Sequence, residues 1–88
     1  MKILIIGMRE KEKDRIIKIK GLEIDFVFSN SITNKKLKNI SKYNHIIGIC
    51  KFSAHVVEYM CNNHPGFIRL RPTQGISSVN NILEELYV

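Results

Sequence analysis

Four short apolar runs, separated by longer polar stretches, constrain the fold of this 88-residue chain more than any other feature. Each run has four to six residues and is rich in isoleucine or phenylalanine, which favour β-strands. Runs that are apolar almost throughout are typical of strands buried on both faces of a parallel sheet. The predicted strands are residues 3–6, 24–28, 45–50 and 67–70.

The polar stretches predict helices. The clearest follows Ser77 or Ser78, where apolar residues recur at i, i+3, i+4 and i+7. Three further helices are predicted over residues 9–20, over residues 33–40 and from residue 53 onward. In the last of these three, Ala54, Val57, Met60 and Cys61 fall on one helical face.

The resulting order of elements is βαβαβαβα. It predicts a minimal Rossmann-like or flavodoxin-like α/β domain over residues 1–88, with a four-stranded parallel sheet and helices on both faces. Arg69 interrupts the fourth run, so residues 67–70 are predicted to form an edge strand. Because so small a domain gains stability by burying an edge or a helix face, we expect a homodimer or larger homo-oligomer.

Charge is unevenly placed along the chain. Residues 1–51 hold twelve of the fourteen Lys and Arg residues but five of the eight Asp and Glu residues, and the whole chain has a formal charge of +6. This pattern indicates either a solvated lysine-rich face or an anionic partner. No apolar run reaches the roughly 18 residues of a membrane span, and the first apolar run is too short for a signal peptide. We therefore expect a cytoplasmic protein, which would lie in the cytoplasm of the host if the protein is viral. In that compartment its two cysteines are expected to be reduced.

The turns that follow the four strands are the predicted binding site. In open parallel sheets, ligands bind beyond the carboxyl ends of the strands, where helix N-termini favour anions. Three of these four turns carry a cation, which suits a phosphate-bearing small molecule. The candidate ligand-binding residues are Gly7, Met8, Arg9, Ser29, Asn30, Ser31, Lys51, Phe52, Ser53, His55, Arg71, Thr73, Gln74, Gly75, Ser77 and Ser78.

Motifs of familiar nucleotide enzymes are missing. Neither Gly-x-Gly-x-x-Gly nor the P-loop pattern occurs, which argues against a nicotinamide dehydrogenase or a P-loop nucleotidase. Cys50 and His55 could form a thiolate–imidazole pair, but no carboxylate lies near them in sequence to orient the histidine. With Cys61 and His64 they offer four zinc ligands, at a spacing that matches no usual site. We therefore predict no catalytic residue, no metal and no cofactor.

Three short stretches resemble a family of small bacterial Rossmann-like domains of uncharacterised function. They are the hydrophobic strand and glycine of residues 3–7, Ser53-Ala54-His55 at a helix start, and Gly75-Ile76-Ser77-Ser78 at the last helix start. The chain departs from the family pattern at Met8, where a second glycine is usual, and at Ala54, which separates the Ser and His. The resemblance implies the fold and a cytosolic setting, but no activity.

These patterns together predict non-catalytic sensing or sequestration of a small anionic, nucleotide-like ligand. One biological version is a viral protein that removes a nucleotide immune signal. Two alternatives stay open: a small transferase or hydrolase that uses Cys50 or His55, and a basic module for nucleic acid or protein. Nucleic acid is the less favoured partner because no aromatic residues interleave with the lysines.

Overall fold

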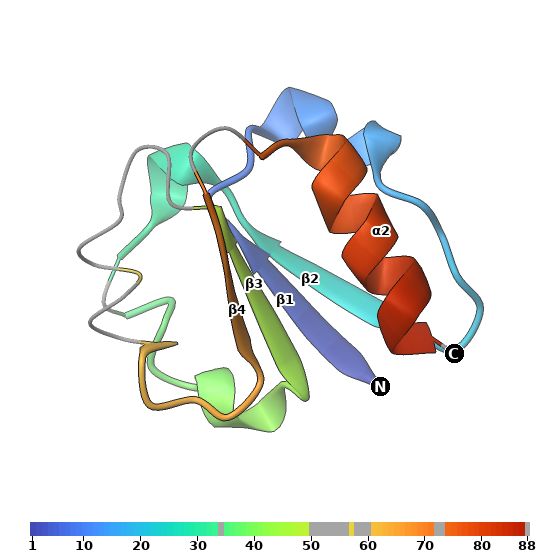
Figure 1. Ribbon diagram of the computed structural model, residues 1–88. Helices are drawn as coiled ribbons and strands as arrows, with labels where there is room; N and C mark the ends of the chain where they lie inside the picture. The colour runs from blue at the N-terminus through green and yellow to red at the C-terminus, as the bar shows by residue number, and fades with distance from the viewer. Residues whose placement is uncertain (34, 50–56, 58–60, 72–73, 88) are drawn as a thin grey trace.

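Four parallel strands form one sheet in the computed structural model, which describes residues 1–33, 35–49, 57, 61–71 and 74–87 (Figure 1). The strands are β1 (Lys2–Ile6), β2 (Glu23–Val27), β3 (His45–Ile49) and β4 (Phe67–Leu70). Their order in space is β2-β1-β3-β4, and all three neighbouring pairs are parallel. The predicted α/β Rossmann-like fold and the edge position of β4 are thus confirmed, although β2 ends one residue earlier than predicted.

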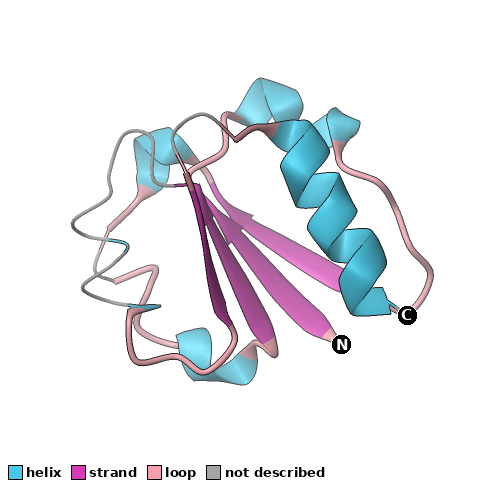
Figure 2. Cartoon of the chain, viewed as in Figure 1, coloured by secondary structure: helices cyan, strands magenta, loops and turns pink. Residues whose placement is uncertain are grey.

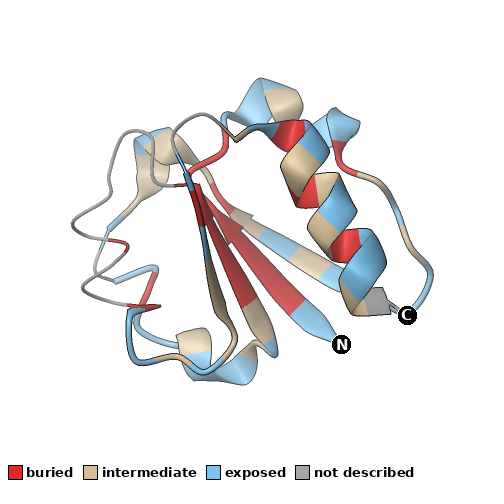
Figure 3. Ribbon diagram, viewed as in Figure 1, coloured by how far each residue is buried: buried red, intermediate tan, exposed pale blue. Residues whose placement is uncertain are grey.

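The central strands are buried on both faces, as their continuous apolar runs require. Ile3 and Ile5 of β1 belong to a cluster on one face of the sheet, whereas Leu4 and Ile6 belong to a second cluster on the other face. All four side chains are at most 2% exposed. Figure 3 shows this burial concentrated along β1 and β3, while β2 at one edge is largely half-buried or exposed.

Helix α2 (Ile76–Tyr87) covers the first face of the sheet (Figure 2). Val79 and Leu83, one turn apart, are fully buried in the cluster that contains Ile3 and Ile5. This is the helix predicted after Ser77 or Ser78, and it starts slightly earlier, at Ile76. The apolar residues at i, i+3, i+4 and i+7 predicted this helix correctly, because burial of one apolar face supplies most of a helix's stability.

The helix predicted over residues 9–20 is wrong. A 3₁₀ helix, η1 (Glu10–Arg15), is followed by a segment over residues 16–22 that contains no regular helix and turns at residues 20–21. Ile16, Ile17 and Ile19 are β-branched, which lowers helix propensity, and their spacing does not place them on one helical face. In this segment, the same residues pack against the cluster under α2.

The helix predicted over residues 33–40 is also wrong. Thr33 does cap a turn as predicted, since its Oγ1 accepts the Lys36 N–H at 3.2 Å. The described residues after that turn form further turns and a short 3₁₀ helix, η3 (Ile40–Lys42). The stretch contains three lysines among residues 35–38, whose mutual repulsion opposes helical growth beyond a costly first turn.

The second face of the sheet is covered by residues distant from one another in sequence. Leu37, Val57 and Cys61 are fully buried there against β1 and β3. Val57 and Cys61 are helical, as predicted, whereas most of the helix predicted from residue 53 lies outside the described residues. The Cys61 side chain is fully buried in this cluster. Within the described part of the chain, no helix has the length and apolar character needed to cross a membrane.

Candidate functional site

The strand order identifies where a ligand is most easily bound in this fold. From β1 the chain moves outward to β2, and from β3 it moves outward in the opposite direction to β4. The connections after β1 and β3 therefore diverge, which leaves a crevice beyond the carboxyl ends of these two neighbouring strands. This is the topological switch point of a flavodoxin-like sheet.

A cavity of about 140 Å³ lies at this switch point. Five of its lining residues were predicted from the sequence: Gly7, Met8, Arg9, Gln74 and Gly75. Three were not: Glu12, Ile49 and Ile76. The turns after β1 and before α2, nearly 70 residues apart in sequence, thus meet at one end of the sheet.

Gly7 brings the backbone of β1 close to that of β3 at the base of the cavity. Its φ of +97° is one that L side chains rarely adopt, and its N–H donates to the carbonyl oxygen of Val27 at 2.9 Å. A Cβ at this position would overlap the carbonyl oxygen of Ile49. Only glycine therefore fits where β1 turns away from the sheet.

Arg9 and Glu12 form an ion pair at the rim. The Glu12 Oε1 accepts both the Arg9 Nε–H, at 3.2 Å, and the Arg9 backbone N–H, at 3.3 Å. Burial acts to raise the pKa of the Glu12 carboxyl, but the hydrogen bonds from Arg9 and the charges of Arg9 and Arg15 outweigh it, so the pKa is lowered. Glu12 consequently stays ionised and offsets part of the positive charge that Arg9 brings to the cavity.

The opposite wall is the turn that leads into α2. The Gln74 side chain accepts the Arg71 N–H at 2.7 Å, and the Gln74 N–H donates to the Arg71 carbonyl at 2.9 Å. Gly75 O accepts the first intrahelical bonds, from Ser78 and Val79. The amides of the first helical turn have no acceptor within the helix, so this end of α2 carries partial positive charge beside the cavity.

The remaining predicted residues fall into three groups. Ser29, Asn30 and Ser31 form the 3₁₀ helix η2 (Ser29–Ser31) after β2; Ser29 N–H donates to the Met8 carbonyl at 2.9 Å, yet none of the three lines the cavity. Ser77 and Ser78 lie in the first turn of α2, and Arg71 is exposed after β4, also outside the lining. Lys51, Phe52, Ser53, His55 and Thr73 lie outside the described residues, and so does Cys50, the partner of His55 in the alternative enzymatic interpretation.

Glu12 is the lining residue that a closer reading of the sequence could have found. It stands three residues after Arg9, a spacing at which opposite charges on a helical turn meet. Ile49 and Ile76 carry no comparable signal, because an isoleucine at the end of a strand or helix is ordinarily core. They line the cavity because β3 ends at Ile49 and α2 begins at Ile76.

His64 is held by hydrogen bonds at both ring nitrogens. Its Nδ1 accepts the Gly66 N–H at 3.0 Å, so the proton of the neutral ring is on Nε2, which lies 3.0 Å from the Tyr43 carbonyl oxygen and donates to it. This imidazole fixes the chain just before β4. Of the four possible zinc ligands in the sequence, His64 is thus hydrogen-bonded to backbone groups and Cys61 is buried in the core.

Comparison of the chain with protein-family models, with curated proteins and with solved structures found no match.

Proposed function

We propose that this protein binds, without turnover, a small anionic nucleotide-like ligand at the carboxyl ends of β1 and β3. The observation that carries the proposal is the cavity at the switch point, between the Gly7 turn and the N-terminus of α2. Backbone amides at such a helix end, together with the Arg9 guanidinium, are donors suited to a phosphate oxygen.

The size of the cavity indicates which part of the ligand enters it. A volume of about 140 Å³ corresponds to roughly five water molecules at about 30 Å³ each. This space suits a phosphate group and is too small for an entire nucleotide. We therefore expect the phosphate to occupy the cavity and the nucleoside to lie outside it.

The proposal is tested by calorimetric titration with mono-, di- and cyclic nucleotides and ADP-ribose, the cyclic members covering nucleotide immune signals. We expect one ligand per chain, recovered unchanged. Arg9→Ala should weaken binding about tenfold through loss of a charge-assisted hydrogen bond. Glu12→Gln should strengthen it about threefold, because it removes a negative charge from the rim yet keeps the oxygen that orients Arg9.

Lys36→Ala is the matched control, since Lys36 is an exposed cation far from the cavity in sequence and absent from its lining. It should leave nucleotide affinity unchanged. Equal losses in Arg9→Ala and Lys36→Ala, or no binding to any member of the panel, would contradict the proposal. Tight binding to oligonucleotides that falls steeply with salt would instead favour the basic nucleic-acid module.

We also propose that the protein forms a homodimer or larger assembly through the edge strand β4. Phe67 and Ile68 on this edge strand are only half-buried within one copy of the chain. Native mass spectrometry, supported by sedimentation at tens of micromolar, should show the assembly and any nucleotide retained through purification. A purely monomeric protein under these conditions would rule the assembly out.

A further inference from the structure

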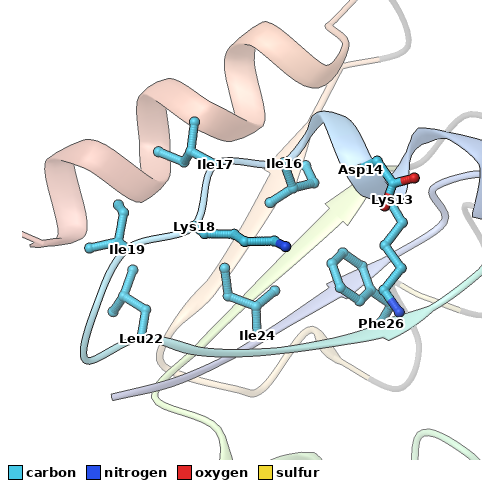
Figure 4. A pocket seen from close by; sticks show the side chains of 9 residues that line it. All are labelled: Lys13, Asp14, Ile16, Ile17, Lys18, Ile19, Leu22, Ile24 and Phe26. Carbon is cyan, nitrogen blue, oxygen red and sulfur yellow. The ribbon is translucent and has the colours of Figure 1, made fainter.

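A second cavity lies between the segment 16–22 and the edge strand β2, and none of the described residues lines both this cavity and the one at the strand ends (Figure 4). Its volume is about 440 Å³, within the range of roughly 300–1,000 Å³ that is usual for ligand sites. Its apolar walls are Ile16, Ile17, Ile19, Leu22, Ile24 and Phe26. These residues also pack against the core cluster under α2, so the cavity is an extension of the hydrophobic core.

The cavity exists because the segment after η1 contains no regular helix. Asn80 of α2 holds this segment at both of its amide atoms: its Oδ1 accepts the Ile17 N–H at 3.0 Å, and its Nδ2–H donates to the Arg15 carbonyl at 3.1 Å. The backbone is therefore fixed to the helix. Ile16 points toward Ile24 and Phe26 of β2, Ile17 points toward α2, and the Lys18 side chain lies between the segment and Ile24 (Figure 4).

The charged groups of this cavity lie in its middle and at its Phe26 end (Figure 4). The Lys13 Nζ lies 5.7 Å from the centre of the Phe26 ring, and the Lys18 side chain extends across the cavity with its amine toward Phe26 (Figure 4). Asp14 is at the same end, which leaves two amines against one carboxylate. Ile19 and Leu22 line the opposite end. A cavity with isoleucine and leucine walls at one end and an excess of amines toward the other suits the polarity of an anionic amphiphile.

The volume of the cavity limits what can occupy it. A helix about 10 Å across that rises about 5.4 Å per turn fills roughly 420 Å³ per turn, so the cavity holds about one turn of a partner helix. A single acyl chain of about fifteen carbon groups, roughly 30 Å³ each, fills the same space, and its carboxylate adds a charge opposite to that of the two amines. A methylene group is of about that size.

We propose that this cavity binds the acyl chain of one monomeric fatty acid. The carboxylate lies between Lys13 and Lys18, and the chain runs toward Leu22. This site is independent of the nucleotide-like ligand proposed above.

Calorimetric titration with octanoate, dodecanoate, tetradecanoate and octadecanoate, each below its critical micelle concentration, tests the proposal. Affinity should rise about threefold for each added methylene and level off once the cavity is filled. Dodecanol should bind more weakly than dodecanoate, and dodecyltrimethylammonium more weakly still. An affinity that does not depend on chain length would overturn the proposal.

Two matched pairs of variants locate the site. Lys13→Glu with Lys18→Glu should weaken dodecanoate binding at least tenfold, whereas Lys11→Glu with Lys20→Glu, exposed lysines outside the lining, should change it less than threefold.

The second pair compares isoleucines of the two edge strands. Ile24 and Ile68 are both half-buried against the same core. Of these two described residues, Ile24 lines the cavity and Ile68 does not. Ile24→Thr should weaken dodecanoate binding about fivefold and Ile68→Thr should not. Equal losses in the two variants, or binding to phosphatidylglycerol vesicles without binding to monomeric dodecanoate, would refute the site. Arg9→Ala should leave dodecanoate binding unchanged, which keeps this result separate from that for the nucleotide-like ligand.

Discussion

Gly7→Ala should lower the free energy of unfolding by about 3 kcal/mol or more, a large part of the roughly 5–15 kcal/mol that stabilises a typical domain. Two costs combine. The φ of +97° is unfavourable for alanine, and the new Cβ would overlap the backbone carbonyl oxygen of Ile49. That carbonyl belongs to β3, which cannot move aside without disturbing its ladder with β1 and β4. Urea unfolding followed by circular dichroism measures the loss.

Two other glycines separate these costs. Gly21 has a φ of +94° but no heavy atom within 4 Å of an added Cβ, so Gly21→Ala should cost only about 1 kcal/mol. Gly75 has neither a positive φ nor a close neighbour, and Gly75→Ala should change stability by less than about 0.5 kcal/mol. If Gly7→Ala were no worse than Gly21→Ala, the close approach of β1 to β3 at the base of the cavity would be wrong.

Leu37→Ala should lower the free energy of unfolding by about 2–4 kcal/mol, although Leu37 lies in a turn and not in a regular helix. Its side chain is 0% exposed and packs with Leu4 and Ile46 on the second face of the sheet. The cavity left by alanine could close only if the surrounding turns moved onto the sheet. Thermal and urea unfolding give the value.

Lys36→Ala is the control for Leu37→Ala, because the neighbouring Lys36 is exposed and should affect stability by less than about 0.5 kcal/mol. A loss below about 1 kcal/mol for Leu37→Ala would mean that the second face of the sheet is covered by other residues. The two predictions together test the turn at the end of β1 and the packing on the second face of the sheet.

The strands were predictable because their signal is local. An apolar run such as Ile3–Ile6 has no alternative to burial on both faces, and Arg69 in the fourth run marks an edge wherever the other strands lie. The crossover helices were not predictable in the same way. Residues 9–20 contain enough charge to suggest a solvated helix, but the fate of Ile16 and Ile17 depended on contacts with α2, whose Asn80 is more than 60 residues away.

The position of the candidate site in the fold was predictable from the sequence. The set of residues that line it was less predictable. In a parallel sheet the carboxyl ends of all strands lie at the same end of the sheet. The pattern of elements therefore already placed the turns at Gly7 and Gln74 at that end. Strand order decides which turns meet, and it cannot be read from alternation alone. The turn at Ser29 therefore lies beside Met8 without lining the cavity, and the partnership of Arg9 with Glu12 weakens the positive rim that counting cations had suggested.

The register of the sheet also bears on how the chain reaches its native state. Ile3 lies beside Ile24 and beside His45, 21 and 42 residues later, and Ile46 lies beside Phe67, again 21 residues later. Long loops must therefore close before any of these pairings stabilises the chain, and proteins dominated by such distant contacts fold in milliseconds to seconds instead of microseconds. During that interval the isoleucine-rich strands are open to strands of other molecules. Recovery from denaturant should consequently be most complete in dilute solution.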